Sequence, residues 1–119
     1  MLVEVITFAG CPHAADALVL ARRLAAQVQG GIEVRLVEIT ERDVLEQRFL
    51  GSPTVRIDGH DVEPGAGSRR DFAFSCRLYQ TPSGARPLPP EEWLRAALAT
   101  PANLAARRAR AAPGISSTP

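Results

Sequence analysis

The chain of 119 residues contains no lysine, and all 14 of its basic residues are arginine. It also lacks long hydrophobic runs: no apolar run approaches the ~20 residues that a helix needs to cross a bilayer. The amino terminus lacks the basic flank and the cleavage site of a signal peptide. We therefore expect a cytoplasmic protein with no membrane partner.

An excess of charge of one sign is also lacking, because 14 basic residues face 13 acidic ones and the formal net charge is +1. A protein dedicated to nucleic acid needs a strong basic surplus, so nucleic acid is not an expected partner. The chain is 45% hydrophobic and 23% charged, which is the balance of a globular protein rather than a disordered one. Its length suits one domain with one core.

The composition changes near residue 100, where alanine, arginine, proline and serine become dominant. Residues 1–99 carry the apolar patterns of a folded domain, whereas residues 100–119 contain Arg107, Arg108 and Arg110 and no acidic residue. A terminal segment with so little to bury is typical of a mobile tail. We expect either an inert solubilising segment or a weak contact with an anionic partner.

The first part of the domain has a strand–helix–strand pattern. Residues 2–8 are rich in β-branched and aromatic side chains and predict a buried strand, and residues 32–39 predict a second strand. Between them, a helix is expected to begin near Pro12 and to end at Gly30-Gly31. Its apolar face consists of Ala17, Leu18, Ala21, Leu24, Ala25 and Val28. This order favours a parallel pair of strands with a right-handed crossover.

The second part predicts a helix, a hairpin and a last helix. A short helix is expected from Thr40, with Asp43 completing the cap, to Gly51. Asp58-Gly59 predicts a tight turn between antiparallel strands at residues 54–57 and 60–63. Residues 64–87 are rich in loop formers, with a short strand possible at 76–79. The last helix is expected to open at Pro89-Pro90.

This order of elements resembles the thioredoxin fold over residues 2–99. Two motifs carry the resemblance: Gly10-Cys11-Pro12-His13-Ala14, which is similar to the CxxC site and especially to the CPHC of DsbA-like oxidases, and Gly51-Ser52-Pro53-Thr54. The resemblance implies an α/β fold of βαβαββα order, with a central four-stranded mixed sheet flanked by helices. It also implies a cis-proline at Pro53 facing the reactive sulfur.

Cys11 is the candidate nucleophile. A sulfur at the start of a helix faces unpaired N–H groups and the positive end of the helix dipole, which favour the thiolate. Cysteines so placed have pKa values lowered to roughly 3.5–7.5. His13 can add a positive or hydrogen-bonding neighbour, and Pro12 fixes the first turn. The alternative is a structural cysteine at Cys11 and a solvent-facing side chain at His13.

A cis bond at Pro53 would turn the chain so that backbone groups of Ser52 or Thr54 can pair with an extended thiol substrate. In the alternative, Ser52-Pro53 simply begins a strand in the trans form. Pro12, Ser52, Pro53 and Thr54 are therefore the candidate substrate-binding residues.

Ala14 stands where a dithiol enzyme has its second cysteine. The chain cannot clear a mixed disulfide by the usual CxxC route, so its mechanism must be monothiol or must use a distant partner. Cys76 is the one other cysteine, and Arg77 beside it could assist its ionisation. The alternative for Cys76 is a packed, half-buried cysteine without a role. A disulfide would need Cα atoms about 4.4–6.8 Å apart.

A second resemblance concerns a group of small bacterial thioredoxin-family proteins. It rests on residues 51–59, on Asp61-Val62 and Pro64-Gly65, on residues 75–79 and on Pro89-Pro90-Glu91. Some members of that group carry selenocysteine at the position of Cys11, and some are labelled alkylmercury lyase-like. Selenium there implies redox nucleophilicity, and the mercury label implies a soft-metal thiolate partner.

Three functions follow as hypotheses. The first is a thiol-disulfide redox protein, an oxidoreductase whose Cys11 attacks a disulfide, sulfenate or peroxide, with Cys76 or a small thiol or reductase completing the cycle. The second is a soft-metal-binding protein in which Cys11 and Cys76 hold a thiophilic ion. The third is a non-catalytic binding module of the same fold. No cofactor is expected, and the two cysteines and two histidines lack the paired spacing of a zinc site.

Overall fold

The computed structural model describes residues 1–28 and 30–99. Strands β1 (Leu2–Thr7), β2 (Glu33–Glu38), β3 (Thr54–Ile57) and β4 (His60–Asp61) form one sheet in the order β2-β1-β3-β4. β1 and β2 are parallel, whereas β3 is antiparallel to both β1 and β4. The expected α/β fold with a four-stranded mixed sheet is therefore confirmed. The predicted tail, residues 100–119, lies outside the described residues.

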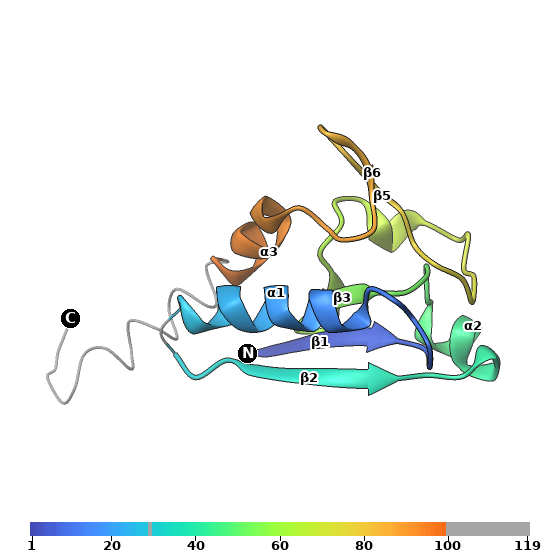
Figure 1. Ribbon diagram of the computed structural model, residues 1–119, viewed down its shortest axis with the longest axis horizontal. Helices are drawn as coiled ribbons and strands as arrows, with labels where there is room; N and C mark the ends of the chain where they lie inside the picture. Colours follow the sequence, from blue (N-terminus) through green and yellow to red (C-terminus); the bar gives the residue numbers. More distant parts are fainter. Residues whose placement is uncertain (29, 100–119) are drawn as a thin grey trace, which may run out of the picture.

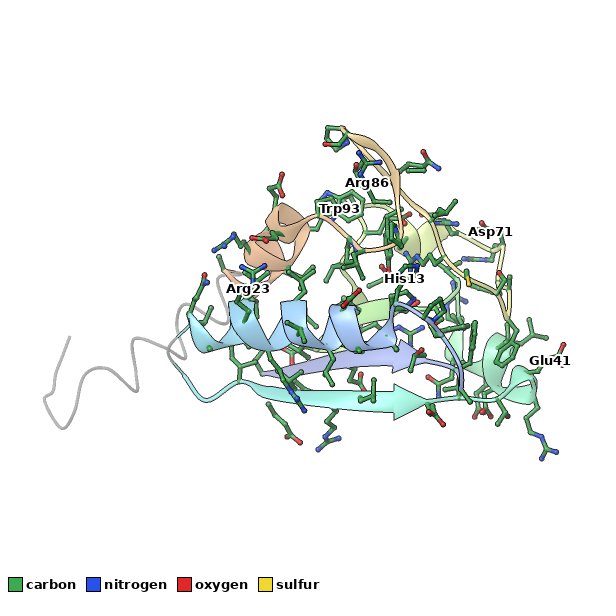
Figure 2. All side chains as sticks on the ribbon, viewed as in Figure 1. His13, Arg23, Glu41, Asp71, Arg86 and Trp93 are labelled. Atoms are coloured by element: carbon green, nitrogen blue, oxygen red, sulfur yellow. The ribbon has the colours of Figure 1, made fainter. Side chains whose placement is uncertain are left out.

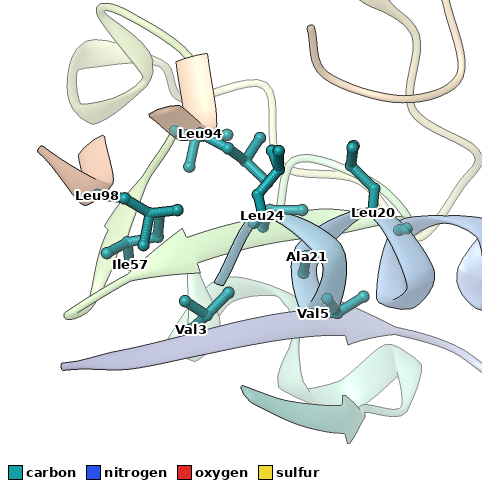
Figure 3. Packing of buried hydrophobic residues seen from close by; sticks show 11 residues of the cluster. Val3, Val5, Leu20, Ala21, Leu24, Ile57, Leu94 and Leu98 are labelled. Atoms are coloured by element: carbon teal, nitrogen blue, oxygen red, sulfur yellow. The ribbon is translucent and has the colours of Figure 1, made fainter. Parts of the chain in front are cut away.

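Helices α1 (Ala14–Ala26) and α3 (Glu91–Leu98) pack together beside the sheet (Figure 1). Figure 3 shows how their apolar side chains meet those of β1 and β3. The buried core cluster consists of Val3, Val5, Ala17, Leu20, Ala21, Leu24, Val55, Ile57, Val62, Leu94 and Leu98. Complete burial of each large aliphatic side chain stabilises the fold by about 1.5–3 kcal/mol. Within the described ranges, no helix is both long and apolar enough to cross a membrane.

A smaller apolar cluster lies around the short second helix. It consists of Ile6, Ile39, Val44 and Phe49. The predicted cap is present, because Asp43 accepts hydrogen bonds from the backbone N–H and the hydroxyl of Thr40. The helix itself is shorter than predicted: a 3₁₀ turn η1 (Glu41–Asp43) leads into α2 (Val44–Gln47). Arg48, with a φ of 52°, ends it before Gly51 is reached.

The turn at Asp58-Gly59 joins β3 to β4 as predicted, with both residues at positive φ. β4 ends at Asp61, two residues earlier than expected, and a 3₁₀ turn η2 (Ala66–Ser68) follows. The short strand expected at 76–79 lies later in the chain, as β5 (Tyr79–Thr81), and it pairs with β6 (Gly84–Arg86), which was not predicted. These strands are three residues long, too short to show an alternating pattern.

Candidate functional site

Cys11 lies in the loop between β1 and α1. Gly10 adopts a φ of 88°, and the N–H of Cys11 donates to the carbonyl of Phe8 at 3.2 Å, which turns the chain sharply after the strand. The helix begins at Ala14 with His13 as its N-cap, so the expectation that Pro12 lies in the first helical turn is wrong by two residues. Figure 2 shows His13 at the amino end of α1. Cys11 is half-buried and its thiol is free.

The surroundings of Cys11 lower the pKa of its thiol. Its partial burial opposes ionisation and is the largest single influence on its pKa. Hydrogen bonding with the Ser52 side chain, the His13 backbone, the Thr7 side chain and the Ala14 backbone together outweighs burial and lowers the pKa of the Cys11 thiol. The environment therefore favours the thiolate, the form that acts as a nucleophile.

The two hydroxyls that face Cys11 come from different parts of the sheet and belong to the buried interior. Thr7 is 2% exposed and Ser52 is completely buried. Their side-chain oxygens lie 2.6 Å apart and share a hydrogen bond in which either can donate, so the pair has one hydroxyl proton at a time left for the Cys11 sulfur. The Ser52-Pro53 peptide bond is cis, as predicted. Thr54 is also buried, and its hydroxyl donates to the carbonyl of Gly51 at 2.6 Å.

The backbone of Ser52 is paired with segment 75–77, which consists of Ser75, Cys76 and Arg77. The N–H of Ser52 donates to the carbonyl of Ser75 at 2.9 Å, and the N–H of Arg77 donates to the carbonyl of Ser52 at 2.9 Å. Ser52 and Cys76 thus form a parallel β-bridge. The backbone of Ser52 was expected to be open to an extended substrate, but in this structure the protein's own chain occupies it. The roles of Pro12, Ser52, Pro53 and Thr54 in substrate binding stay predictions.

Cys76 is exposed and its thiol is free. Residues paired across a β-bridge direct their side chains to the same face. Cys76 is therefore expected to project to the face on which the Ser52 hydroxyl meets Cys11. The bridge places Cys76 beside Ser52, whose side chain helps to lower the pKa of Cys11, and the resolving role of Cys76 stays a prediction.

Arg77 follows Cys76 in the extended chain, so its side chain projects to the face opposite that of Cys76 and anchors segment 75–77 there. Its guanidinium is bound to Asp61 at 2.8 and 3.1 Å, to Glu63 at 3.0 Å and to the hydroxyl of Thr54 at 2.9 Å. It also lies over the ring of Tyr79, 4.3 Å from the centroid. The side chain of Arg77 is only 1% exposed. These carboxylates hold the guanidinium inside the protein, so the structure gives no support to the expectation that Arg77 assists the ionisation of Cys76.

The sequence contained one signal for this anchor. Asp61 and Glu63 are two residues apart, so their side chains share one face of an extended chain and can bind a common cation. Charge alone did not identify Arg77 as that cation among 14 arginines. Tyr79 is completely buried, and its hydroxyl donates to the carbonyl of Pro53.

An aromatic pair joins the two loops that carry the cysteines. Phe8 precedes Cys11 by three positions and Phe74 precedes Cys76 by two, and their ring centroids lie 4.8 Å apart. Figure 1 shows the β1–α1 loop and the chain between η2 and β5 at the same end of the molecule. The contact packs the two cysteine-bearing segments against each other.

A groove elsewhere on the described surface lacks a thiol and an imidazole. It has a volume of about 580 Å³ and lies between α1 and the β5–β6 hairpin, and the described residues that line it include neither a cysteine nor a histidine. Among residues 1–28 and 30–99, no cluster of three or more His, Cys, Asp or Glu side chains could hold a metal ion. His60 lies exposed in the β3–β4 hairpin. Cys11 and its donors therefore form the best candidate site.

Comparisons of the chain with protein-family models, with curated proteins and with solved structures found no match.

Proposed function

We propose that this protein is a thioredoxin-like thiol-disulfide redox protein in which Cys11 is the nucleophile. The observation that carries the proposal is the position of Cys11 directly before α1, beside the buried Thr7–Ser52 hydroxyl pair, where hydrogen bonding outweighs burial and lowers the pKa of its thiol. Both hydroxyls of this pair belong to the buried interior. A sulfur that is merely packed needs no such hydrogen bonding.

In the proposed reaction, the thiolate of Cys11 attacks one sulfur of a disulfide and the other sulfur leaves as a thiolate, which takes up a proton from water. Hydrogen bonding with the backbones of His13 and Ala14 favours the thiolate form of the attacking sulfur. The imidazole of His13 is proposed to act beside the sulfur. Ala14 provides no second thiol, so the mixed disulfide must be cleared by another thiol.

The thioredoxin-like arrangement is itself part of the proposal. Its support is the order of elements and the sheet order β2-β1-β3-β4, with Cys11 following β1 and Ser52-Pro53 preceding β3. Both motifs that carry the resemblance to thioredoxins thus lie at one end of the sheet. There the hydroxyls of Thr7 and Ser52, which are 45 positions apart in the sequence, are in contact.

The test is the pH dependence of Cys11 reactivity. Cys76→Ser protein isolates Cys11, and its rate of alkylation by iodoacetamide is followed against pH, with Cys11→Ser as the control. We expect a pKa below that of an ordinary cysteine and stoichiometric reaction with glutathione disulfide. A pKa at or above the ordinary value, or no reaction with glutathione disulfide, would refute the proposal.

A soft-metal site is the second candidate, because the β-bridge at Ser52 brings Cys76 into the same neighbourhood as Cys11. Two thiolates suit a thiophilic ion such as mercuric ion. Equal loss of mercuric binding in Cys11→Ser and Cys76→Ser, without any reaction with disulfides, would favour this function over redox catalysis.

A further inference from the structure

Segment 75–77 is hydrogen-bonded to the backbone of Ser52, where an extended substrate could otherwise pair. Ser52 has one N–H and one carbonyl, and both are bonded to this segment. A peptide that approaches Cys11 therefore finds neither group of Ser52 available for main-chain pairing.

The segment is fixed on both sides of the bridge. Before it, the N–H of Ala73 donates to the carbonyl of Phe49 at 2.9 Å, and Phe74 packs on Phe8. After it, the buried guanidinium of Arg77 is bound by Asp61 and Glu63. A Cβ added at Gly51 would lie 2.8 Å from the Cβ of Arg77, so the two chain segments are also in close contact.

We infer that segment 75–77 is a built-in substitute for a substrate strand, which restricts the site to low-molecular-weight disulfides and supplies Cys76 as the resolving thiol. This inference rests on the proposed function, because it requires Cys11 to react with disulfides. It adds the class of substrate and the route by which the mixed disulfide is cleared.

The chemistry balances in two steps. The Cys11 thiolate attacks a small disulfide RSSR, a bond forms between Cys11 and one SR group, and the other leaves as a thiolate that is protonated by water. The Cys76 thiol then gives its proton to water and attacks the sulfur of Cys11, which expels the second RS group as a thiolate that is also protonated by water. The protein is oxidised by two electrons to a Cys11–Cys76 disulfide, and RSSR is reduced to two RSH. An external dithiol or two small thiols return the electrons.

The experiment mixes the reduced protein with glutathione disulfide and follows the products by mass spectrometry. We expect a monomeric Cys11–Cys76 disulfide with release of two glutathiones. Cys76→Ser should stop at a Cys11–glutathione mixed disulfide, and Cys11→Ser should form neither product. A lasting mixed disulfide in the wild-type protein, or a disulfide between two chains, would overturn the inference and leave the proposed function intact. Absence of any reaction would overturn the proposed function.

A second measurement tests the substrate class. The rate with glutathione disulfide is compared with the rate for the disulfide of a short extended peptide that has a central cysteine. We expect no gain for the peptide, since Ser52 offers it no free backbone group. A gain of about tenfold, the size expected from two additional main-chain hydrogen bonds, would show that segment 75–77 does not exclude peptides.

Discussion

Removal of the Ser52 hydroxyl should raise the pKa of Cys11. Ser52 provides the largest of the influences that lower this pKa, and its side chain is buried. A hydrogen bond to a charged group contributes about 1.5–3 kcal/mol, and one pKa unit corresponds to about 1.4 kcal/mol. Ser52→Ala is therefore expected to raise the pKa by roughly one to two units.

The sign of the effect on reactivity depends on pH. Because the folded protein has a lowered pKa, the thiolate is present above that pKa and is lost as the pH falls through it. Below the pKa values of both proteins, raising the pKa by one leaves about tenfold less thiolate in the variant, but each thiolate is about threefold more nucleophilic. For such an increase, the variant should react about threefold more slowly at low pH and faster at high pH, so the two profiles cross.

The assay is alkylation by iodoacetamide against pH, in a Cys76→Ser background so that only Cys11 reacts. Ser83→Ala, in the turn between β5 and β6, is the matched control and should leave the profile unchanged. Profiles of Ser52→Ala and its parent that coincide would refute the assignment of Ser52 as the main donor.

Three further predictions concern stability. Arg77→Ala should lower the free energy of unfolding by about 3 kcal/mol in urea titration, because it leaves two partly buried carboxylates without their cation; a loss under about 1 kcal/mol would contradict this. Burial raises the pKa of Glu63, but hydrogen bonds from arginines outweigh it and lower this pKa. The contribution of Glu63 to the free energy of unfolding should therefore be complete above about pH 4.5 and disappear as the pH falls through the folded pKa. Glu63→Gln should remove this acid dependence in urea titrations at several pH values. Gly51→Ala should cost about 1–3 kcal/mol in the same titration, because φ is 123° and the added Cβ meets Arg77; an unchanged midpoint would show that the two chain segments are not in close contact.

Local signals in the sequence predicted local structure well. The cap at Thr40, the turn at Asp58-Gly59 and the parallel pairing of the first two strands each depend on a few neighbouring residues or on a general chain rule. The position of Cys11 after the first strand was predicted in the same way. The cis bond at Pro53 was expected through the resemblance to thioredoxins, not through the residue pattern, and the structure contains it.

The contacts that define the site could not be predicted because they join distant parts of the chain. The bridge between Ser52 and Cys76 has no local signature, since one paired residue makes no strand. The hydroxyl of Thr7 faces Cys11 only because β1 and the residues before β3 meet at the same end of the sheet. The burial of Arg77 depends on carboxylates contributed by the end of the β3–β4 hairpin.

Arg77 makes two kinds of contact: its backbone N–H donates to the carbonyl of Ser52, and its guanidinium forms buried ion pairs. Freeing the backbone of Ser52 by withdrawing this residue therefore also means opening the ion cluster. With an opening cost of about 3 kcal/mol, fewer than about one molecule in a hundred would be open at any moment. A large protein partner would then react at a rate limited by this rare opened population, whereas a small molecule would not need to wait for it.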